Sequence, residues 1–296
     1  MHGPPSAAET NRGRLAVVFT LTLGVFIVQA VGGMVTGSLA LVADAGHNFT
    51  DVIGIGLSLG AIALAARPAS GARTYGFLRL EILAAVANAV LLMGVAAYVL
   101  FEAVRRLVTP QEIASGLMLA IALVGLAANA IGLYLLRDVQ HTSLNMRGAY
   151  LEVMGDLAGS LAVVVAAAVI AVTGWRQADA IASAAIALLI LPRTWRLLKD
   201  AIDILLEATP KDIDLAAVRR HILEADGVAD VHDLHAWTIT SGMNVVSAHV
   251  VLAEGADPPR VLDELCRCLS GDFDVEHSTF QLENADRRRL EERAHV

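Results

Sequence analysis

Six long apolar stretches, separated by short polar connections, occupy the first two thirds of the chain. They lie near residues 15–36, 39–66, 80–104, 113–136, 147–173 and 178–195. Each approaches or exceeds the ~20 apolar residues with which an α-helix crosses the hydrocarbon core of a bilayer. Gly and Pro residues in the connections, such as Pro68, Pro110 and Gly174, are typical of turns. The pattern predicts six transmembrane helices.

After about residue 205 the hydrophobic period changes. Residues 212–225 and 258–270 have the pattern of amphipathic helices, and residues 230–240, 243–252 and 274–283 that of strands. The order αββαβ is typical of a small ferredoxin-like α+β domain. We therefore expect a polytopic α-helical membrane protein with a transmembrane domain over 1–204 and a cytosolic domain over 205–296. The charged tail after residue 285 is expected to be frayed.

Composition supports a membrane protein and excludes several other classes. The 296 residues are 56% hydrophobic and 18% charged, against about 25% charged in soluble domains. A purely soluble enzyme is therefore excluded. The two cysteines, Cys266 and Cys268, are too close in sequence to form a structural disulfide framework, and we expect inert thiols. Residues 201–296 have a net charge of −10, which disfavours nucleic acid and suits cations as partners.

The distribution of Arg and Lys predicts the orientation in the membrane. Six spans place both ends of the chain on the same side. If the N-terminus is inside, ten Arg and Lys residues flank the inner ends of the spans and three flank the outer ends. Because positive residues accumulate on the cytoplasmic side, we expect a multi-pass protein of the plasma (inner) membrane with both termini in the cytoplasm.

Ionisable residues inside two of the apolar stretches are the main indication of function. The second stretch contains Asp44, His47 and Asp51, and the fifth contains Glu152 and Asp156. His47 and Asp51 are four residues apart, as are Glu152 and Asp156, so each pair lies on one face of its helix. We expect no Lys or Arg to neutralise them. Ionisable groups at membrane depth face the interior and are functional by default, so two such pairs predict a cation site.

The expected ligands are one imidazole and three carboxylates. Zinc accepts this set, and manganese, iron and cobalt accept it as well. Because the ligands must lose protons to bind a metal, such a site also exchanges protons. The alternative is that these groups only hydrogen-bond across helices without a metal. Asp44 is either a supporting residue behind His47 or a structural one.

Other polar residues in or near the spans have structural interpretations. Gln29, Asn88 and Asn129 are expected to hydrogen-bond between helices. We expect Glu81 to form an ion pair with Arg79. Asp179 is expected to cap the sixth span, which begins beside it.

Five segments resemble the cation diffusion facilitator family, in its zinc/cobalt/cadmium efflux branch. They are GSLALVADAGHNFTD at 37–51, RTYGFLRLEILAAVAN at 73–88, MRGAYLEVMGDLAGS at 146–160, DAIAS at 179–183 and VHDLHAWTIT at 231–240. The resemblance implies six transmembrane helices, a cytosolic ferredoxin-like domain and a homodimer. It implies export of a divalent metal, usually zinc, in exchange for protons. The family's transport site matches His47, Asp51, Glu152 and Asp156.

The sequence departs from the family pattern at Glu152, where the zinc branch commonly has His. Oxygen ligands suit harder cations than imidazole does, so Mn²⁺, Fe²⁺ and Co²⁺ are candidates beside Zn²⁺. The resemblance to the zinc/cobalt/cadmium branch adds Cd²⁺ as a candidate. Residues 67–79 contain no His or acidic residue. The loop metal site that some members carry between the second and third spans is therefore expected to be absent.

Histidines are frequent in the expected cytosolic domain. By resemblance, His232, His249 and His277 match the family's cytosolic metal-binding positions, with Glu283 as a further ligand. The alternative is that some of them are ordinary strand histidines. Strand alternation places His235 on the face opposite to His232, in a core or interface role. His221, on the first soluble helix, is expected to be exposed.

The sequence predicts a proton-coupled metal efflux transporter that works by alternating access, not an enzyme. No GxxxxGK[ST] loop for ATP is present, and no prosthetic group is expected. Two other functions stay open: a membrane-anchored metal sensor, and an intramembrane metalloenzyme that uses the same ligands around a catalytic water.

Overall fold

The computed structural model describes residues 12–65, 69–141 and 144–291. The chain divides into two compact units, and each is described by itself. The first contains Met1–Gly60 and Ala84–Leu198, and the second contains Ala61–Leu83 and Lys199–Val296. The short segment between the second and third long helices therefore belongs with the C-terminal part of the chain.

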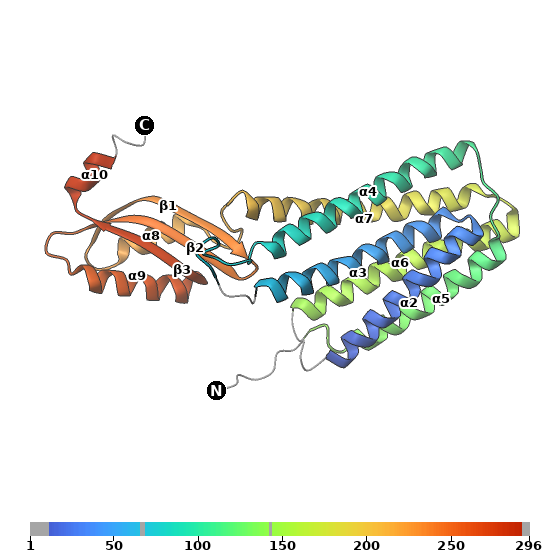
Figure 1. Ribbon diagram of the computed structural model, residues 1–296, viewed down its shortest axis with the longest axis horizontal. Coiled ribbons are helices and arrows are strands. Elements are labelled where there is room, and N and C mark those ends of the chain that lie inside the picture. The colour runs from blue at the N-terminus through green and yellow to red at the C-terminus, as the bar shows by residue number, and fades with distance from the viewer. Residues whose placement is uncertain (1–11, 66–68, 142–143, 292–296) are drawn as a thin grey trace. The chain divides into compact units, whose positions relative to one another are not determined.

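Long helices form at each of the six apolar stretches (Figure 1). They are α2 (Arg12–Thr36), α3 (Leu39–Ala65), α4 (Leu80–Val108), α5 (Ser115–Leu136), α6 (Leu144–Thr173) and α7 (Gln177–Leu205). Among the described residues, all of these except α3 are long and apolar enough to cross a membrane. A helical membrane domain is thereby confirmed. The 27 residues of α3 include Asp44, His47 and Asp51, and α3 stays a predicted span.

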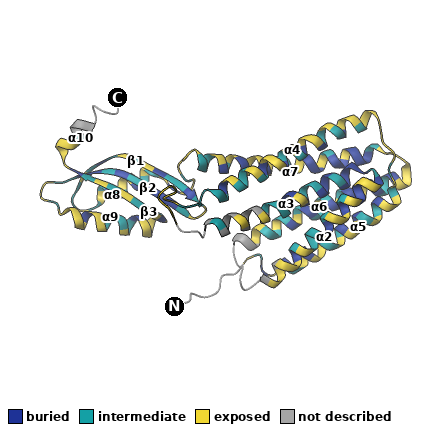
Figure 2. Ribbon diagram, in the orientation of Figure 1, coloured by how far each residue is buried: buried dark blue, intermediate teal, exposed yellow. Residues whose placement is uncertain are grey.

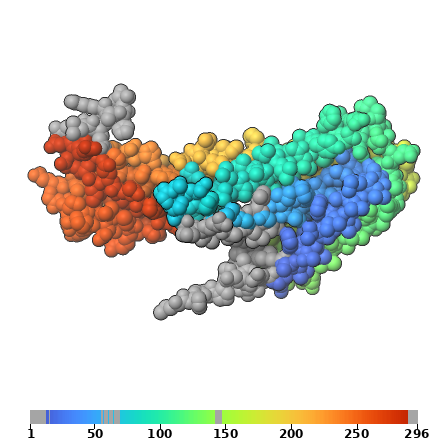
Figure 3. Space-filling view, in the orientation of Figure 1, coloured from blue at the N-terminus to red at the C-terminus, as the bar shows by residue number. Residues whose placement is uncertain are grey.

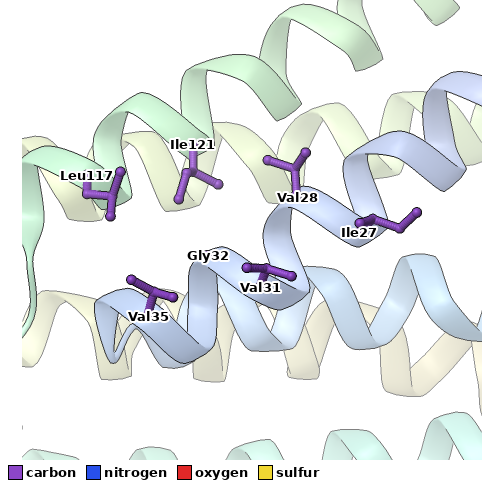
Figure 4. Close-up of a pocket in the computed structure, with 7 residues that line it drawn as sticks. All are labelled: Ile27, Val28, Val31, Gly32, Val35, Leu117 and Ile121. Carbon is purple, nitrogen blue, oxygen red and sulfur yellow. The ribbon is translucent and has the colours of Figure 1, made fainter.

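Small residues let the helices of the first unit pack closely. In α2, a Cβ atom added at Gly32 would lie 2.5 Å from Cδ1 of Ile121 on α5. Figure 3 shows α2 lying along α5. An apolar groove of about 390 Å³ is lined by residues of these two helices, among them Val28, Val35 and Leu117 (Figure 4). Glycine at such a crossing allows the backbones to approach, as is usual between membrane helices.

The first half of α3 is among the most buried parts of the first unit (Figure 2). Leu39, Ala40 and Leu41 are at most 2% exposed. They belong to a core that α4, α5, α6 and α7 also line. Because this half of α3 is enclosed by its neighbours, the buried polar side chains of Asp44, Asn48 and Thr50 face other helices.

Asp179 caps a different helix from the one expected. It lies in the first turn of α7, yet its carboxylate accepts hydrogen bonds from the backbone N–H groups of Leu39 and Ala40 at 2.7 and 3.1 Å. Ser38 Oγ donates a third hydrogen bond at 2.6 Å. These groups belong to the N-terminal end of α3, where helical N–H donors have no partner in their own helix. The expectation that Asp179 caps the sixth span is therefore wrong, and it fixes α7 to α3.

The second unit contains the α+β domain. Its elements are α8 (Leu215–Glu224), β1 (Val228–Thr240), β2 (Met243–Leu252), α9 (Pro258–Asp272), β3 (Val275–Glu283) and α10 (Ala285–Glu291). The sheet has the order β1-β2-β3, with β1 antiparallel and β3 parallel to β2. Asp214 caps α8 by accepting a hydrogen bond from Ala216 N. The αββαβ prediction is confirmed, whereas α10 is helical where a frayed tail was expected.

Apolar residues of α8 and α9 cover one face of this sheet. Ile222, Leu265 and Leu269 are fully buried against Val246 and Val250 of the central strand. Burial of each large aliphatic side chain contributes about 1.5–3 kcal/mol. The opposite face of the sheet carries the polar side chains.

Glu81 and Arg79 do not form the expected ion pair. Glu81 accepts hydrogen bonds from Thr240 Oγ1 at 2.5 Å and Ser241 Oγ at 3.0 Å, at the turn between β1 and β2. Arg79 instead pairs with Glu207 at 2.7 Å. All five residues belong to the second unit. Arg79 was the expected partner because it lies two residues from Glu81 in the sequence. In the structure, the polar groups of the hairpin turn bind Glu81 instead.

Candidate metal centres

Helices α3 and α6 bring three of the predicted ligands together. Nε2 of His47 lies 3.2 Å from Oδ1 of Asp156 and 3.7 Å from Oδ2 of Asp51. One ligand atom from each residue lies within 4.8 Å of the others. His47 and Asp51 share a face of α3 because they are one turn apart, and Asp156 approaches that face from α6. The arrangement is compact enough for one cation.

The polar atoms of this cluster are not satisfied within the described part of the chain. Nδ1 of His47, Oδ2 of Asp51 and Oδ1 of Asp156 are buried and have no hydrogen-bond partner among the described residues. Buried polar groups are almost always paired, because leaving one unpaired costs about 1–3 kcal/mol. A divalent cation bound by carboxylate oxygen and imidazole nitrogen would remove that cost, so the donor set fits a metal.

Glu152 does not join this cluster. Its Oε1 lies 3.6 Å from Nη2 of Arg193 on α7, and its side chain is 40% exposed. By contrast, the Asp156 side chain, one turn further along α6, is 3% exposed. The structure thus brings together three of the four predicted ligands. The expectation that no Lys or Arg neutralises them is wrong, since Arg193 reaches Glu152 from another helix.

Asp44 lies behind the cluster in a buried polar network. Its Oδ2 accepts hydrogen bonds from Gln29 Nε2 at 2.6 Å and Ser160 Oγ at 3.1 Å. Asn129 donates to Ser160, and Asn48 donates to Gln29. The interhelical hydrogen bonds expected of Gln29 and Asn129 are therefore confirmed, and the network links α2, α3, α5 and α6.

Sequence reasoning missed two members of this network. It also expected a hydrogen bond of Asn88 for which the described residues show no partner at Oδ1. Asn48 and Ser160 were not singled out, although Ser160 follows Asp156 by one helical turn, which was a usable signal. Asn88 was expected to hydrogen-bond between helices, but its Oδ1 is buried without a partner among the described residues. Gly159 allows α6 to approach Asp44, since a Cβ there would lie 3.0 Å from Oδ1 of Asp44.

A second cluster lies on the sheet face that the helices leave open. Nε2 of His232 lies 2.5 Å from Oε1 of Glu283, and Nδ1 of His249 lies 3.8 Å from Oε2 of the same residue. One ligand atom from each of the three residues lies within 4.8 Å of the others. Two imidazoles and a carboxylate are ligands that zinc accepts in tetrahedral sites, so these residues fit a divalent metal.

A β-bulge corrects the expected position of His235. His232 pairs with His249 and His235 with Ser247, so three steps along β1 match two steps along β2. The additional residue, Asp233, has a positive φ of 49°. A bulge shifts the alternation by one residue, so His235 lies on the same face as His232. It is exposed and 2.9 Å from Asp233 Oδ1, not in the core.

The structure does not bring His277 to this cluster. His277 and Glu283 share a face of β3, but six residues of strand separate them by roughly 20 Å at ~3.3 Å per residue. The exposed His277 ring instead lies edge-on to Tyr75, with centroids 6.1 Å apart. His221 is half-buried beside Asp272 and is not the exposed residue that was expected. The two cysteines are free, and burial raises the pKa of the Cys268 thiol above its ordinary value.

Comparisons with known proteins match both parts of the chain. Residues 15–206 match the family described as cation efflux transmembrane domain, and residues 210–285 match the cytoplasmic domain of cation efflux proteins. The chain is 46% identical to metal cation efflux system protein CzcD of Cupriavidus metallidurans, over 93% of this chain and 87% of CzcD. It is 39% identical to zinc transporter ZitB of Escherichia coli, over 93% and 88%.

Two further relatives extend this comparison. The cadmium, cobalt and zinc/H(+)-K(+) antiporter of Bacillus velezensis is 38% identical over 96% of this chain and 92% of its own. A solved structure of the metal-bound C-terminal domain of the CzcD transporter is 43% identical, covers 24% of this chain and 99% of that one, and has a TM-score of 0.23.

Both matched parts are domains of one class of protein, a multi-pass metal cation efflux transporter with a cytoplasmic C-terminal domain. This class transports and does not catalyse a reaction. The chain belongs to the cation diffusion facilitator family, close to the efflux proteins CzcD and ZitB. The family resemblance of the five sequence segments is thereby confirmed.

Proposed function

We propose that this transporter exports zinc, and with it cadmium and cobalt, from the cytoplasm in exchange for protons. The observation that carries the proposal is the cluster of His47, Asp51 and Asp156, whose buried atoms lack hydrogen-bond partners among the described residues. The names of the relatives, which include zinc, cadmium and cobalt transporters and a proton antiporter, support the metals and the counter-ion.

The ligand chemistry is consistent with these metals. One imidazole nitrogen and carboxylate oxygens suit borderline divalent cations, and nothing in the set is soft enough to favour Cu(I). With three ligands from the protein, one coordination position is left for water or for Glu152. Manganese and iron(II) are weaker candidates, which an additional oxygen from Glu152 would favour.

Proton exchange follows from the same atoms. A metal requires an unprotonated imidazole and ionised carboxylates, so protons and metal compete for His47, Asp51 and Asp156. Lower pH on the outer side then favours release of the metal there, and the protonated site returns inward. Alternating access requires only that α3 and α6 expose the cluster to one side at a time.

We further propose a homodimer with the transport domain over 1–204 and the cytosolic domain over 205–296. Both termini are in the cytoplasm, the protein lies in the inner membrane, and α3 crosses the bilayer as the second of six spans. The cluster of His232, His249 and Glu283 would hold a regulatory metal in the cytosolic domain. The description of residues 210–285 as a cation efflux cytoplasmic domain supports the side of the membrane.

The test is transport by the purified protein in sealed proteoliposomes that contain a pH-sensitive dye. Zinc, cadmium, cobalt, nickel, manganese and iron(II) are added one at a time. The proposal expects zinc uptake together with proton efflux, and loss of most uptake when an ionophore collapses the pH gradient. Binding without flux would instead indicate a sensor, and flux that is unchanged by the ionophore would exclude antiport.

A further inference from the structure

We propose that Arg193 is a built-in counter-ion of the transport site, which balances the charge of Glu152 and competes with the metal for its carboxylate. Glu152 and Arg193 then act as one unit that sets the affinity of the site and the rate of metal release. This inference rests on the proposed function. It concerns a residue outside the ligand cluster and a neighbouring helix, α7.

The geometry places the pair directly beside the cluster. Glu152 lies one turn before Asp156 on α6, on the same helical face, and its Oε1 is 3.6 Å from Nη2 of Arg193. Side-chain exposure increases from 3% at Asp156 to 13% at His47, 40% at Glu152 and 60% at Arg193. The pair therefore lies at the more exposed end of the cluster.

The charges explain why the pair belongs together. With a divalent cation bound, the carboxylates of Asp51, Asp156 and Glu152 carry one more negative charge than the metal neutralises. Arg193 supplies the missing positive charge. A site with His in place of Glu152 would be neutral with two carboxylates and would need no arginine. Arg193 thus compensates for the third carboxylate beside the metal, that of Glu152.

The guanidinium of Arg193 is unfavourable in an apolar helix, and its ion pair with Glu152 reduces that free-energy cost. Arg193 lies within a helix that is apolar enough to cross a membrane, and an unpaired guanidinium in such a helix is unfavourable. Its ion pair with Glu152 therefore opposes movement of the carboxylate toward a metal at His47 and Asp156. Pro192, the preceding residue, cannot donate the helical hydrogen bond to its turn, which makes α7 easier to bend at this level.

The pair consequently gives the site two arrangements. In one, Glu152 binds Arg193 and the cluster offers three ligands. In the other, Glu152 turns to the metal as a fourth ligand, and Arg193 is released. A metal bound by three ligands exchanges rapidly, and a metal bound by four is held tightly. The ion pair therefore limits the affinity of the site for the metal and keeps its release fast.

A charge-exchange experiment tests this arrangement. Zinc transport is measured in proteoliposomes for wild type, Glu152→His, Arg193→Gln and the double variant. Arg193→Gln removes the competitor, so KM should decrease about threefold to tenfold while kcat also falls, because release becomes slower. Glu152→His leaves Arg193 unpaired beside the metal, so KM should rise about tenfold.

The double variant decides the question. It restores the charge balance of the metal-bound site, so its KM should return to within about threefold of wild type. Arg193→Lys, which keeps the charge, should stay close to wild type. The matched control is Arg196→Gln, which removes a positive charge about one turn further along α7 and should leave KM and kcat unchanged.

Each outcome has a distinct meaning. If the two substitutions add without rescue, or if Arg193→Gln leaves KM unchanged, Arg193 is not a counter-ion of the site and the inference is wrong. If Arg193→Gln lowers kcat alone and Arg193→Lys does not rescue it, its role is only structural. If wild type transports no metal, the proposed function fails instead, and zinc binding by the same four proteins still measures the coupling.

Discussion

Nε2 of His47 on α3 lies 3.2 Å from Oδ1 of Asp156 on α6, so the two helices meet through a pair of candidate metal ligands. The imidazole and the carboxylate attract each other when His47 is protonated, and a divalent cation between them replaces that attraction by two coordination bonds. Metal binding and protonation are therefore alternative ways to satisfy the same contact. Both also hold α3 and α6 together, which ties the state of the site to helix packing.

Replacement of Asp156 by Asn should abolish transport without unfolding the protein. Asn has the same shape, but its amide is neutral and is a poor ligand beside His47. Loss of a direct ligand should reduce zinc transport by more than about 100-fold. Mutation of residues that only support metal ligands already reduces metal affinity or activity by about 10- to 100-fold. Initial rates in proteoliposomes measure this effect. The double variant Cys266→Ser with Cys268→Ser is the control and should transport normally; transport by Asp156→Asn at the wild-type rate would exclude the site.

Two glycines of the same helix should respond to alanine in opposite ways. A Cβ at Gly33 would lie 2.7 Å from Cγ2 of Val42 and 3.1 Å from its backbone N, whereas a Cβ at Gly24 meets nothing within 4 Å. Gly33→Ala should therefore destabilise the protein by about 1–3 kcal/mol. Gly24→Ala should be neutral or stabilise it by up to about 1 kcal/mol, because alanine favours the helix. Thermal unfolding in detergent tests both, and equal effects would contradict the close contact of α2 with α3.

Removal of the Asp179 carboxylate should loosen the start of α3. Asp179→Ala leaves the N–H groups of Leu39 and Ala40 without their acceptor in a buried position. The expected loss is about 2 kcal/mol, the upper range for a helix cap. Asp138→Ala removes an exposed carboxylate that pairs with Arg137 at 3.2 Å, and it should change the melting temperature little. Identical melting temperatures for the two variants would show that this contact contributes nothing.

The cytosolic cluster should make the stability of the full-length protein depend on metal. If His232, His249 and Glu283 bind zinc, an excess of 100 times the dissociation constant adds about 2.7 kcal/mol to the free energy of unfolding of that domain. His249→Ala should remove the increase and a chelator should reverse it. His221→Ala, on α8 near Asp272, is the control and should retain it. Zinc-dependent stabilisation that persists in His249→Ala would place the metal elsewhere.

The Cys268 thiol should react only in alkaline solution. Burial raises the pKa of Cys268, and only the thiolate reacts with iodoacetamide. A raised pKa means that the thiolate forms at higher pH than in an ordinary cysteine, so Cys268 should be nearly unreactive at neutral pH and react only in alkaline solution. Mass spectrometry of the Cys266→Ser protein measures this rate against pH. Rapid alkylation at neutral pH would contradict the burial of this side chain.

The sequence by itself determined the elements and the residue types of the candidate ligands. Long apolar runs can satisfy their backbone only as helices in a membrane, so the six stretches were predictable, as was the αββαβ order from the change of period. The i,i+4 spacing of His47 with Asp51 placed both on one helical face without any knowledge of the fold. These features follow from the local geometry of one segment and do not depend on its neighbours in the fold.

The tertiary structure decided which of these groups meet. Glu152 pairs with Arg193, Asp179 caps α3 and Glu81 binds the turn at Ser241, and in each case the partner comes from another element. A single bulge at Asp233 moved His235 to the face of His232, which strand alternation could not foresee. Which partner a side chain finds depends on how the helices and strands approach one another. The competing hydrogen bonds and ion pairs have similar energies, so the sequence alone does not show which of them forms. Local pattern therefore fixes the face on which a residue lies within a regular helix or strand, whereas bulges and packing decide the rest: where the regular pattern breaks, and what each side chain touches.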